Sequence, residues 1–437
     1  MSTILSRLQD YPRSLLYILA LGLIFRTVYI SLHERPLISD EKEYARLAYN
    51  IVSTGSYTYG GSPTAYRPVG YPAFISLVYV FTGHHPIAVK FLQGLLDALV
   101  ALMIYHLLSG FSERARLLGA ALWAFYPPAI LYSNFLLSES IFTFVLATTF
   151  LFFQKSDLNK TARALLLGML FGVLVLMKPS FLAFLILLPA VFHKLQTSMR
   201  PLGVIAIGTL LVISPWVVRN YLTLGRVLLS SNGGINLLIG NNPNTTGAYA
   251  INWPPEVLQR TRNEIDADQL AFDYAARYVV SNPGLFLANG AKKIAHLFES
   301  EGGVLVWSFH GNPEDTSTRY AAKYASLPFI FIFFVNASHI IILIAGILGF
   351  LAFPREKLWW LFAALLTSWL MTHFVFFGGG RFHFPLMPFF AIFAAGFLTQ
   401  YRESLRELSK GRRIVAVGAI AALLAVWILE AIIVLNA

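Results

Sequence analysis

The sequence predicts an all-α polytopic membrane protein, with about eleven transmembrane helices. Of its 437 residues, 57% are hydrophobic and 15% aromatic, whereas 13% are charged; a soluble domain has roughly 25% charged residues. Apolar segments of about 14 to 25 residues recur along the chain, and a helix of about 20 residues crosses the hydrocarbon core. The net charge of +11 comes from short Lys and Arg clusters between these segments, which is typical of topology signals and indicates no nucleic-acid partner.

The first expected span contains Arg26 and is not followed by a small-residue cleavage site, so we expect it to be retained rather than removed as a signal peptide. Prolines in "ALWAFYPPAILYSN" and "KPSFLAF" predict kinks in two later segments. The expected spans are 14–32, 86–108, 117–133, 138–154, 164–178, 180–193, 201–218, 327–350, 358–377, 383–400 and 413–436.

The apolar stretch "GYPAFISLVYVFTG", residues 70–83, decides the orientation of all that follows. If it lies in the interface instead of crossing the membrane, the basic clusters between spans all face the cytoplasm, as the positive-inside rule requires. We therefore expect an interfacial helix here, an extracytoplasmic first loop and a C-terminus outside. The clusters are Arg7 and Arg13; Arg114 and Arg116; Lys155, Lys160 and Arg163; Lys194 and Arg200; Arg355 and Lys357; and Arg402, Arg406, Lys410, Arg412 and Arg413.

Three parts are expected along the chain. Residues 1–218 form an N-terminal transmembrane module that includes the first external loop, residues 33–85, and residues 323–437 form a C-terminal transmembrane module. Residues 219–322 are polar and turn-rich, with an amphipathic helix that ends at Asn-Pro-Gly, so they predict a small extracytoplasmic α-rich subdomain. No internal repeat is visible, and the inverted-repeat pattern of many transporters is not indicated.

Four ionisable residues, Asp40 to Glu43, stand together in "LISDEKEYARLAYNIVSTG" at the predicted membrane surface. Apolar residues follow at i, i+3, i+4 and i+7 from Tyr44, which predicts a short interfacial helix that ends near Gly55. Asp40 is then an N-cap, with Glu43 completing a capping box, or a base that faces an external site. The two roles do not exclude each other.

One more acidic residue and four basic residues are expected at the same face. Glu139, in "NFLLSES", is either a favourable first-turn glutamate or part of a site, since a charge left at bilayer depth costs about 2 to 3 kcal/mol. A single outer cation is most simply a snorkelling anchor, but four together oppose the positive-inside bias and suggest a bound phosphate. The four are Arg67, Lys178, Arg219 and Arg381.

The neighbouring polar residues are candidates for substrate binding. Tyr66 precedes Arg67, and Asn241 and Asn242 lie in "GGINLLIGNNPNTTG", whose amides and turns suit a hydroxyl-bearing ligand. An ordinary loop is the alternative for this segment.

No metal site is expected. His84 and His85 are adjacent and point apart, His310 has no carboxylate at ligand spacing, and the chain has no cysteine. Lys90 and Asp97 are seven residues apart on one helix face and are expected to be a buried structural pair or to line a pore.

A carboxylate, phosphate-binding cations and an amide-rich loop at a membrane surface suit the transfer of a sugar from a lipid phosphate. One carboxylate suffices as the base for an acceptor hydroxyl. Phosphate leaves as a stable anion, so the second, acidic carboxyl group of glycoside hydrolysis is not needed. Electrostatic stabilisation of the departing phosphate would supply much of the remaining rate.

The motifs "SDEKEYARLA", "YRPVGYP", "LLSES", "MKPS", "SPWVVRNY", "GGINLLIGNNPNTTG" and "GGGRFHFPLMP" occur in this order. Together they resemble the bacterial branch of the GT-C integral membrane glycosyltransferases, in particular the family 39 group of protein O-mannosyltransferases and lipid A aminoarabinose transferases. The resemblance covers about residues 14–400. It implies a polyprenyl-phosphate sugar donor, an extracytoplasmic active site and inversion at the anomeric carbon.

The resemblance also implies roles for particular residues. Asp40 with Glu41 matches the acidic pair of the first external loop, and Glu139 matches the acidic residue of the second. External cations hold the donor phosphate, and the matches are Arg381 and Lys178, followed by Arg67 and Arg219. Some relatives bind a divalent ion, but no ligand set is assigned here and no cofactor is expected with certainty.

The expected function is therefore an inverting glycosyltransferase in the bacterial inner membrane, with its active site facing outward. Its expected partners are a polyprenyl-phosphate sugar, membrane lipids and an acceptor that is an envelope glycan, lipid or protein. The alternatives are a transporter or flippase of a lipid-linked sugar and a non-catalytic binding protein. A transporter would place charges along a path through the bilayer, where only Lys90 and Asp97 qualify.

Overall fold

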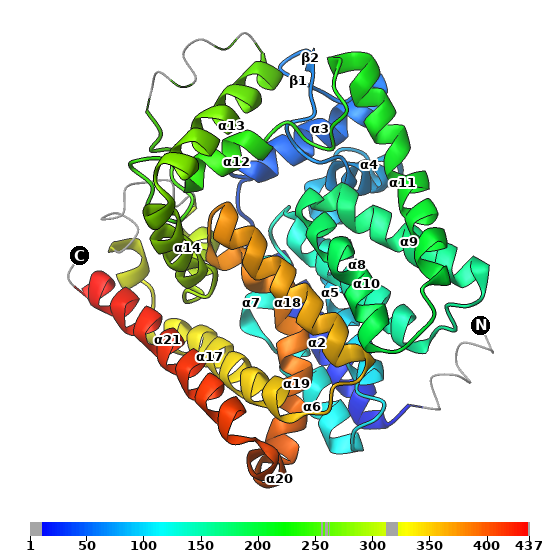
Figure 1. Cartoon of the computed structure of the whole chain (residues 1–437), viewed down its shortest axis with the longest axis vertical. Helices are drawn as coiled ribbons and strands as arrows, with labels where there is room; N and C mark the ends of the chain where they lie inside the picture. The colour runs from blue at the N-terminus through cyan, green and yellow to red at the C-terminus, as the bar shows by residue number, and fades with distance from the viewer. Residues whose placement is uncertain (1–10, 255–256, 258–260, 262, 312–321, 436–437) are drawn as a thin grey trace.

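The structure is a computed structural model that describes residues 11–254, 257, 261, 263–311 and 322–435 (Figure 1). Helices dominate this part of the chain. The strands within it are those of one short hairpin, β1 (Thr58–Tyr59) and β2 (Ser62–Pro63). The prediction of an all-α fold is confirmed.

The helices follow one another with short connections. The N-terminal ones are α2 (Arg13–Leu32), α3 (Asp40–Thr54), α4 (Gly70–Thr82), α5 (Pro86–Leu107), α6 (Glu113–Ala124), α7 (Pro127–Tyr132), α8 (Ser138–Lys155), α9 (Thr161–Met177), η1 (Pro179–Phe181), α10 (Leu182–Lys194) and α11 (Arg200–Leu224). The others are α12 (Gly233–Gly240), α13 (Glu264–Ser281), α14 (Pro283–Leu297), α15 (Gly302–His310), α17 (Phe329–Ala352), α18 (Lys357–Val375), η3 (Gly380–Leu386), α19 (Met387–Thr399), α20 (Tyr401–Glu407) and α21 (Lys410–Leu435).

Seven segments within the described residues are long and apolar enough to cross a membrane: α2, α5, α11, α17, α18, η3 with α19, and α21. The polytopic prediction is confirmed by these helices. The other four expected spans are also helical, at α6 with α7, α8, α9, and η1 with α10, but they do not meet the same test of length and apolarity. The number eleven therefore stays a prediction.

Prolines begin new helices within one expected span and between two others. The segment predicted as one helix at 117–133 is two, since α6 ends at Ala124 and α7 begins at Pro127. Proline has no N–H to donate and clashes with the preceding turn, so it begins a new helix more readily than it continues one. Pro179 likewise starts the η1 turn before α10.

Small residues let two helix pairs approach closely, as in many membrane bundles. A Cβ on Gly168 of α9 would lie 2.1 Å from the carbonyl oxygen of Ile205 in α11. A Cβ on Gly349 of α17 would lie 2.1 Å from the carbonyl oxygen of Phe393 in α19. Neither position can accept a side chain without moving a backbone.

Segments from both ends of the chain meet around the first loop. In Figure 1, α3, α4 and the β-hairpin lie at one end of the molecule, beside α12 and α13, while α17, α19 and α21 lie toward the other end. Glu264, at the start of α13, accepts hydrogen bonds from the Thr64 hydroxyl (2.5 Å), the Ala65 N–H (2.7 Å) and the Ser231 hydroxyl (2.9 Å). These bonds fasten the 64–65 backbone to the α12–α13 segment.

A fully buried ion pair joins α2 to α5. Arg26 donates from Nε to Asp97 Oδ2 at 2.7 Å, and both side chains are 0% exposed. Its Nη1 also donates to the carbonyl oxygens of Gly22 and Ala124. The expected pairing of Lys90 with Asp97 is wrong, because helical spacing within α5 carries no information about the charge that α2 supplies.

Replacing Asp97 alone with leucine is expected to destabilise the fold by about 3–5 kcal/mol, because Arg26 would be buried without a counter-charge. The double change Arg26→Met with Asp97→Leu should recover most of that loss. Thermal melting in detergent, followed by size-exclusion chromatography, measures both effects. A double variant that melts no later than Asp97→Leu would contradict this account of the pair.

Candidate active site

Five segments that are distant in sequence bring charged side chains together. Asp40 is the first residue of α3, Arg67 precedes α4, Glu139 is in the first turn of α8, Lys178 follows α9, and Arg381 lies in η3. Two sets of ion pairs connect them. Each of the five residues stands at the end of a helix, where the chain leaves or enters regular structure.

Asp40 bridges two arginines. Its Oδ1 accepts from Nη2 of Arg67 at 2.7 Å, and its Oδ2 accepts from Nη1 of Arg381 at 2.9 Å. Burial alone would raise the pKa of the Asp40 carboxyl, but the adjacent Arg381 and Arg67 outweigh burial and lower that pKa to about 2. Asp40 is therefore ionised, and both of its oxygens are occupied.

The predicted capping box does not form. The Nε of Arg67 donates to Glu43 Oε2 at 2.5 Å, so Glu43 faces the same arginine as Asp40. The Arg67 guanidinium also lies 5.2 Å from the ring of Tyr66 and 5.7 Å from the ring of Tyr44. Tyr66, a predicted substrate-binding residue, thus borders the cluster.

Glu139 and Lys178 form a second pair beside the first. The Lys178 Nζ donates to Glu139 Oε1 at 3.0 Å, with the two side chains 15% and 4% exposed. The ring of Phe382 lies 5.9 Å from Lys178 Nζ and 4.9 Å from the Arg381 guanidinium carbon. One aromatic side chain therefore contacts the cations of both pairs.

Glu41 does not share the position of Asp40, although the two are adjacent. Its carboxylate receives two hydrogen bonds from Arg35, at 2.6 and 2.8 Å, and accepts from the backbone N–H groups of Ile38 and Leu136. Glu41 is 1% exposed. These bonds hold the start of α3 against the segment before α8, and a catalytic role for Glu41 stays a prediction.

Arg219 does not join the cluster either. Its two terminal nitrogens donate to the backbone carbonyls of Tyr57 and Thr64, each at 2.7 Å. Its guanidinium fixes the β-hairpin region to the end of α11. The expectation that Arg219 holds a phosphate stays a prediction.

The amides of Asn241 and Asn242 face the protein interior. Asn241 donates to the carbonyls of Leu237 and Val375 and accepts from Lys293 Nζ at 2.9 Å. Asn242 donates to the carbonyl of Leu238 and is 0% exposed. Both side chains stabilise the loop after α12, and their role in substrate binding stays a prediction.

Several residues that organise this region are not evident from the sequence. Arg35 gives Glu41 its partner, and Lys293, 0% exposed, donates to the carbonyls of Phe374 and Val375 at the end of α18. A lysine in an amphipathic helix would ordinarily be predicted to face water. Its hydrogen bonds to carbonyl groups identify Lys293 as a buried structural residue, and the residues that carry those carbonyl groups lie far away in the sequence.

The histidines considered in the sequence do not converge. His84 packs against the rings of Tyr49 and Tyr79, at 4.8 and 4.9 Å. His310 lies 3.1 Å from the hydroxyl of Ser326.

The cluster of Asp40, Glu43, Arg67, Glu139, Lys178 and Arg381 contains three carboxylates and three cations, so its formal charges cancel. Arg67 and Arg381 each keep N–H groups beyond those used by Asp40 and Glu43, and their side chains are 17% and 25% exposed. The arrangement can therefore bind an anion if the cations exchange a carboxylate for it. It also holds two carboxylates that such an exchange would release.

No protein-family model and no curated protein matches the chain. Solved structures similar to it are the Archaeoglobus fulgidus oligosaccharyltransferase in the apo form, the archaeal oligosaccharyltransferase AglB from Archaeoglobus fulgidus in complex with an inhibitory peptide and a dolichol-phosphate, and ArnT from Cupriavidus metallidurans bound to undecaprenyl phosphate. Their TM-scores are 0.47, 0.45 and 0.43, at 15%, 15% and 14% identity. In the same order, the similarity covers 96%, 95% and 89% of this chain. It covers 56%, 55% and 77% of the three solved chains. This chain therefore spans little more than half the length of the archaeal protein.

Glu41→Ala is expected to lower the melting temperature strongly, by an amount that corresponds to about 3–5 kcal/mol, because Arg35 would remain buried without its partner. Glu43→Ala is the matched control, since Glu43 is 29% exposed and bonds only one nitrogen of Arg67 among the contacts described. Melting of both purified variants in the same detergent tests this. If Glu41→Ala melts like Glu43→Ala, Glu41 is not the structural residue described above.

Proposed function

We propose that the chain is an inverting glycosyltransferase of the GT-C type, which moves a monosaccharide from a polyprenyl-phosphate donor to an acceptor hydroxyl outside the cytoplasmic membrane. The observation that carries the proposal is the convergence of Asp40, Glu139, Arg67, Lys178 and Arg381 at the ends of apolar helices. A site for a membrane-bound phosphate needs both features, because the phosphate requires cations and its lipid tail requires an apolar surface.

In the proposed reaction Asp40 accepts the proton of the acceptor hydroxyl while the hydroxyl oxygen attacks the anomeric carbon. The bond from that carbon to the phosphate oxygen breaks, and its electrons pass to the phosphate. Arg67, Arg381 and Lys178 stabilise the charge that develops there. Glu139 holds Lys178 in place and orients the acceptor.

The ion pairs also suggest how the base becomes available. With both arginines on its oxygens, Asp40 has a pKa of about 2 and is a poor proton acceptor. A donor phosphate competes for the same guanidinium groups. As Arg67 and Arg381 turn to the phosphate, the pKa of Asp40 rises toward its ordinary value, so donor binding prepares the base.

An apolar groove between α4 and α5 supports a place for the lipid tail. It is lined by Phe74, Leu77, Val78, Phe81, Thr82, Ala88 and Leu92. The side chains of Leu77 and Phe81 are among the exposed hydrophobic residues of the structure. α4 begins three residues after Arg67, so the helix that forms one wall of this groove starts beside the cluster.

The proposed orientation of the chain in the membrane follows from the charged residues at the two ends of the helices. A second cavity is lined by residues of the α8–α9 connection, the α10–α11 connection and the start of α18, including Lys155 and Lys357. Three of the basic connections therefore meet at one end of the bundle, whereas Glu139, Lys178 and Arg381 stand at the other ends of α8, α9 and α18. Under the positive-inside rule the basic end would face the cytoplasm and the cluster would face outward. A bacterial inner membrane is proposed from the resemblance of the sequence motifs.

A transporter or flippase of a lipid-linked sugar is less well supported. It would be expected to line a path through the bilayer with charged groups. Asp97, the main candidate for such a path, is instead closed off against Arg26 with both side chains 0% exposed.

Asp40→Asn is expected to abolish the release of free polyprenyl phosphate from polyprenyl-phosphate monosaccharides, with a loss of at least 100-fold, which is the lower range for general-base catalysis. A panel of donor sugars with envelope extract as the acceptor source would be assayed with the purified protein. Asp273→Asn, an exposed carboxylate in α13, is the matched control and should keep full activity.

Two outcomes would count against this proposal. Equal release by the wild type and by a folded Asp40→Asn variant would remove Asp40 as the base. No release from any donor by folded wild-type protein, with the extract active in a control reaction, would favour the transporter instead.

Arg381→Lys and Arg67→Lys are each expected to weaken the binding of polyprenyl phosphate by about tenfold or more, because lysine keeps the charge but loses the planar fork that binds two oxygens. Arg46→Lys, on an exposed position of α3, should leave binding unchanged. Native mass spectrometry of protein in lipid nanodiscs with added polyprenyl phosphate measures all three. Unchanged affinity in both cluster variants would mean that the phosphate binds elsewhere.

A further inference from the structure

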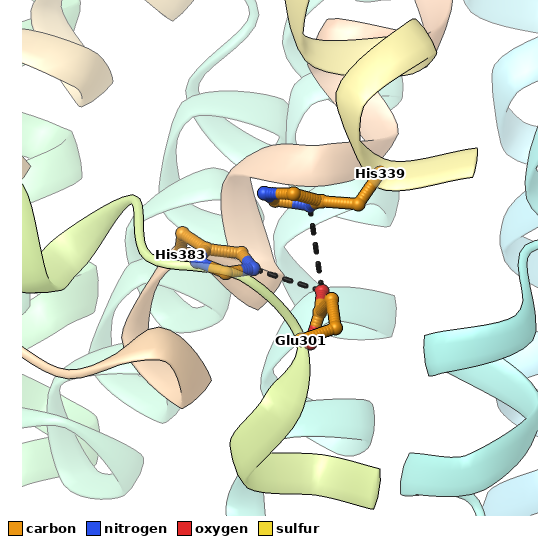
Figure 2. Close-up of side chains that lie close together, drawn as sticks. All are labelled: Glu301, His339 and His383. Carbon is orange, nitrogen blue, oxygen red and sulfur yellow. Dashed lines mark hydrogen bonds and ion pairs between the residues drawn. The ribbon is translucent and has the colours of Figure 1, made fainter. Parts of the chain in front are cut away.

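A second cluster lies deeper in the fold than the charged site. Glu301 directly precedes α15, His339 lies in α17 and His383 lies in η3, and their side chains are at most 1% exposed. Figure 2 shows the two imidazole rings turned toward the same carboxylate oxygen. One ligand atom from each residue lies within 4.8 Å of the others.

The Oε1 atom of Glu301 is the centre of this cluster. It lies 2.9 Å from Nε2 of His383 and 3.5 Å from Nδ1 of His339. The hydroxyl of Tyr126 lies 2.8 Å from the same oxygen and 3.1 Å from Nδ1 of His339. Four atoms that can donate electron pairs thus face one another in a space closed to solvent.

The contact between Glu301 and His383 requires a positive charge. Nδ1 of His383 lies 2.8 Å from the carbonyl oxygen of Leu297, and a carbonyl can only accept, so Nδ1 carries the proton. A neutral His383 then presents the lone pair of Nε2 to a carboxylate, which is also an acceptor. A proton, carried by His383 or by Glu301, or a metal cation must lie between them.

A metal ion explains more of this geometry than a proton does. A proton on Nε2 would satisfy His383 and Glu301, and the Tyr126 hydroxyl donates a hydrogen bond to Glu301 Oε1 at 2.8 Å. The approach of His339 Nδ1 to the same oxygen, at 3.5 Å, is the feature that a proton on His383 does not explain. Ligands of a tetrahedral zinc ion, with bonds of about 2.0–2.2 Å, are roughly 3.3 to 3.5 Å apart. The separation of 3.5 Å matches these values, those of 2.8, 2.9 and 3.1 Å are shorter, and the ligand atoms of Glu301, His339 and His383 all lie within 4.8 Å of one another. The side chains would therefore move apart to admit the ion.

We propose that Glu301, His339 and His383, with the hydroxyl oxygen of Tyr126, bind one divalent transition-metal ion of the zinc class. Imidazole nitrogens and a carboxylate oxygen are ligands that zinc prefers. The carboxylate provides the negative charge that a buried divalent ion requires.

One of the two histidines has the outer contact expected around such a site, whereas Nε2 of His339 is buried without a hydrogen-bond partner among the described residues. Ligating histidines usually donate their other N–H to a carbonyl or carboxylate, which fixes the ring and its tautomer, and the bond from His383 to Leu297 does this. Asn336 Oδ1 accepts from the backbone N–H of Glu301 at 3.0 Å and so fixes the start of α15. Both bonds hold the ligands in place before the ion binds.

The proposed ion would act as a structural link and does not depend on the proposed transferase function. It would tie α15, α17 and η3 together near the charged cluster. His383 follows Arg381 by two residues within η3, and the N–H of Gly380 donates to Glu299 Oε1 at 3.0 Å. The position of Arg381 would therefore be held from behind by the metal ligands.

Metal analysis of the purified chain tests the proposal, with an affinity tag that contains no histidine. After incubation with Zn²⁺ and desalting, one equivalent of zinc per chain is expected by mass spectrometry of the elements. Glu301→Gln, His339→Gln and His383→Gln should each reduce bound zinc at least tenfold. His373→Gln is the matched control, since His373 is also buried and bonds a carbonyl, that of Phe377, and it should keep the zinc.

A spectroscopic measurement on the wild type covers the case in which the variants do not fold. Co²⁺ in place of Zn²⁺ should give the visible absorption bands of tetrahedral cobalt, and X-ray absorption of the zinc form should show two imidazoles and oxygen ligands. The proposal is overturned if the folded wild type retains no metal after this loading, if His373→Gln loses as much zinc as His383→Gln, or if the absorption shows another ligand set. In the first case the cluster is a protonated His383 paired with Glu301.

Discussion

The carboxylate of Asp40, shared between Arg67 and Arg381, is the interaction on which the charged site depends. It joins the first loop to η3, two segments from opposite halves of the chain. Charges at the edge of an apolar bundle are costly unless they are paired, so each cation in this region has to meet a carboxylate. The requirement for pairing therefore positions Arg67 and Arg381, and with them the starts of α4 and η3. The site is a consequence of charge compensation as much as of helix packing.

The same chemistry builds the scaffold around the site. Glu41, Glu264 and Lys293 are buried or half-buried, and each bonds backbone groups at the end of a helix or in a loop. Helix ends leave N–H and C=O groups without partners, and in a chain so poor in charge a few ionisable residues satisfy many of them. Ionisable residues of the same types thus serve two purposes. A residue paired with another side chain can exchange that partner for a ligand. A residue bonded to backbone groups cannot make this exchange and stabilises the fold.

The distinction between side-chain and backbone partners explains how much of the fold and of the candidate site the sequence could predict. Periodicity and composition predicted the helices, including α3, and the break at Pro127, because these depend on local properties. Asp40, Glu139, Arg67, Lys178 and Arg381 were predicted to lie near one another, and the structure joins them in two sets of ion pairs. Glu41, Arg219 and the two asparagines could not be separated from them, since their partners, such as Leu136 and Val375, lie far along the chain. The cluster of Glu301, His339 and His383 was missed for the same reason, as its ligands have no common spacing.

The cancellation of charge in the site has a further physical consequence. Three unpaired cations at a membrane surface would bind any anion and would repel one another when empty. Pairing them with Asp40, Glu43 and Glu139 keeps the empty site neutral, so an incoming phosphate must provide better partners than the carboxylates do. Guanidinium groups can make that exchange because their donors match two oxygens of a phosphate. The exchange releases a carboxylate as the phosphate binds, and under the proposed mechanism the base would then be free only in a site that already holds its donor.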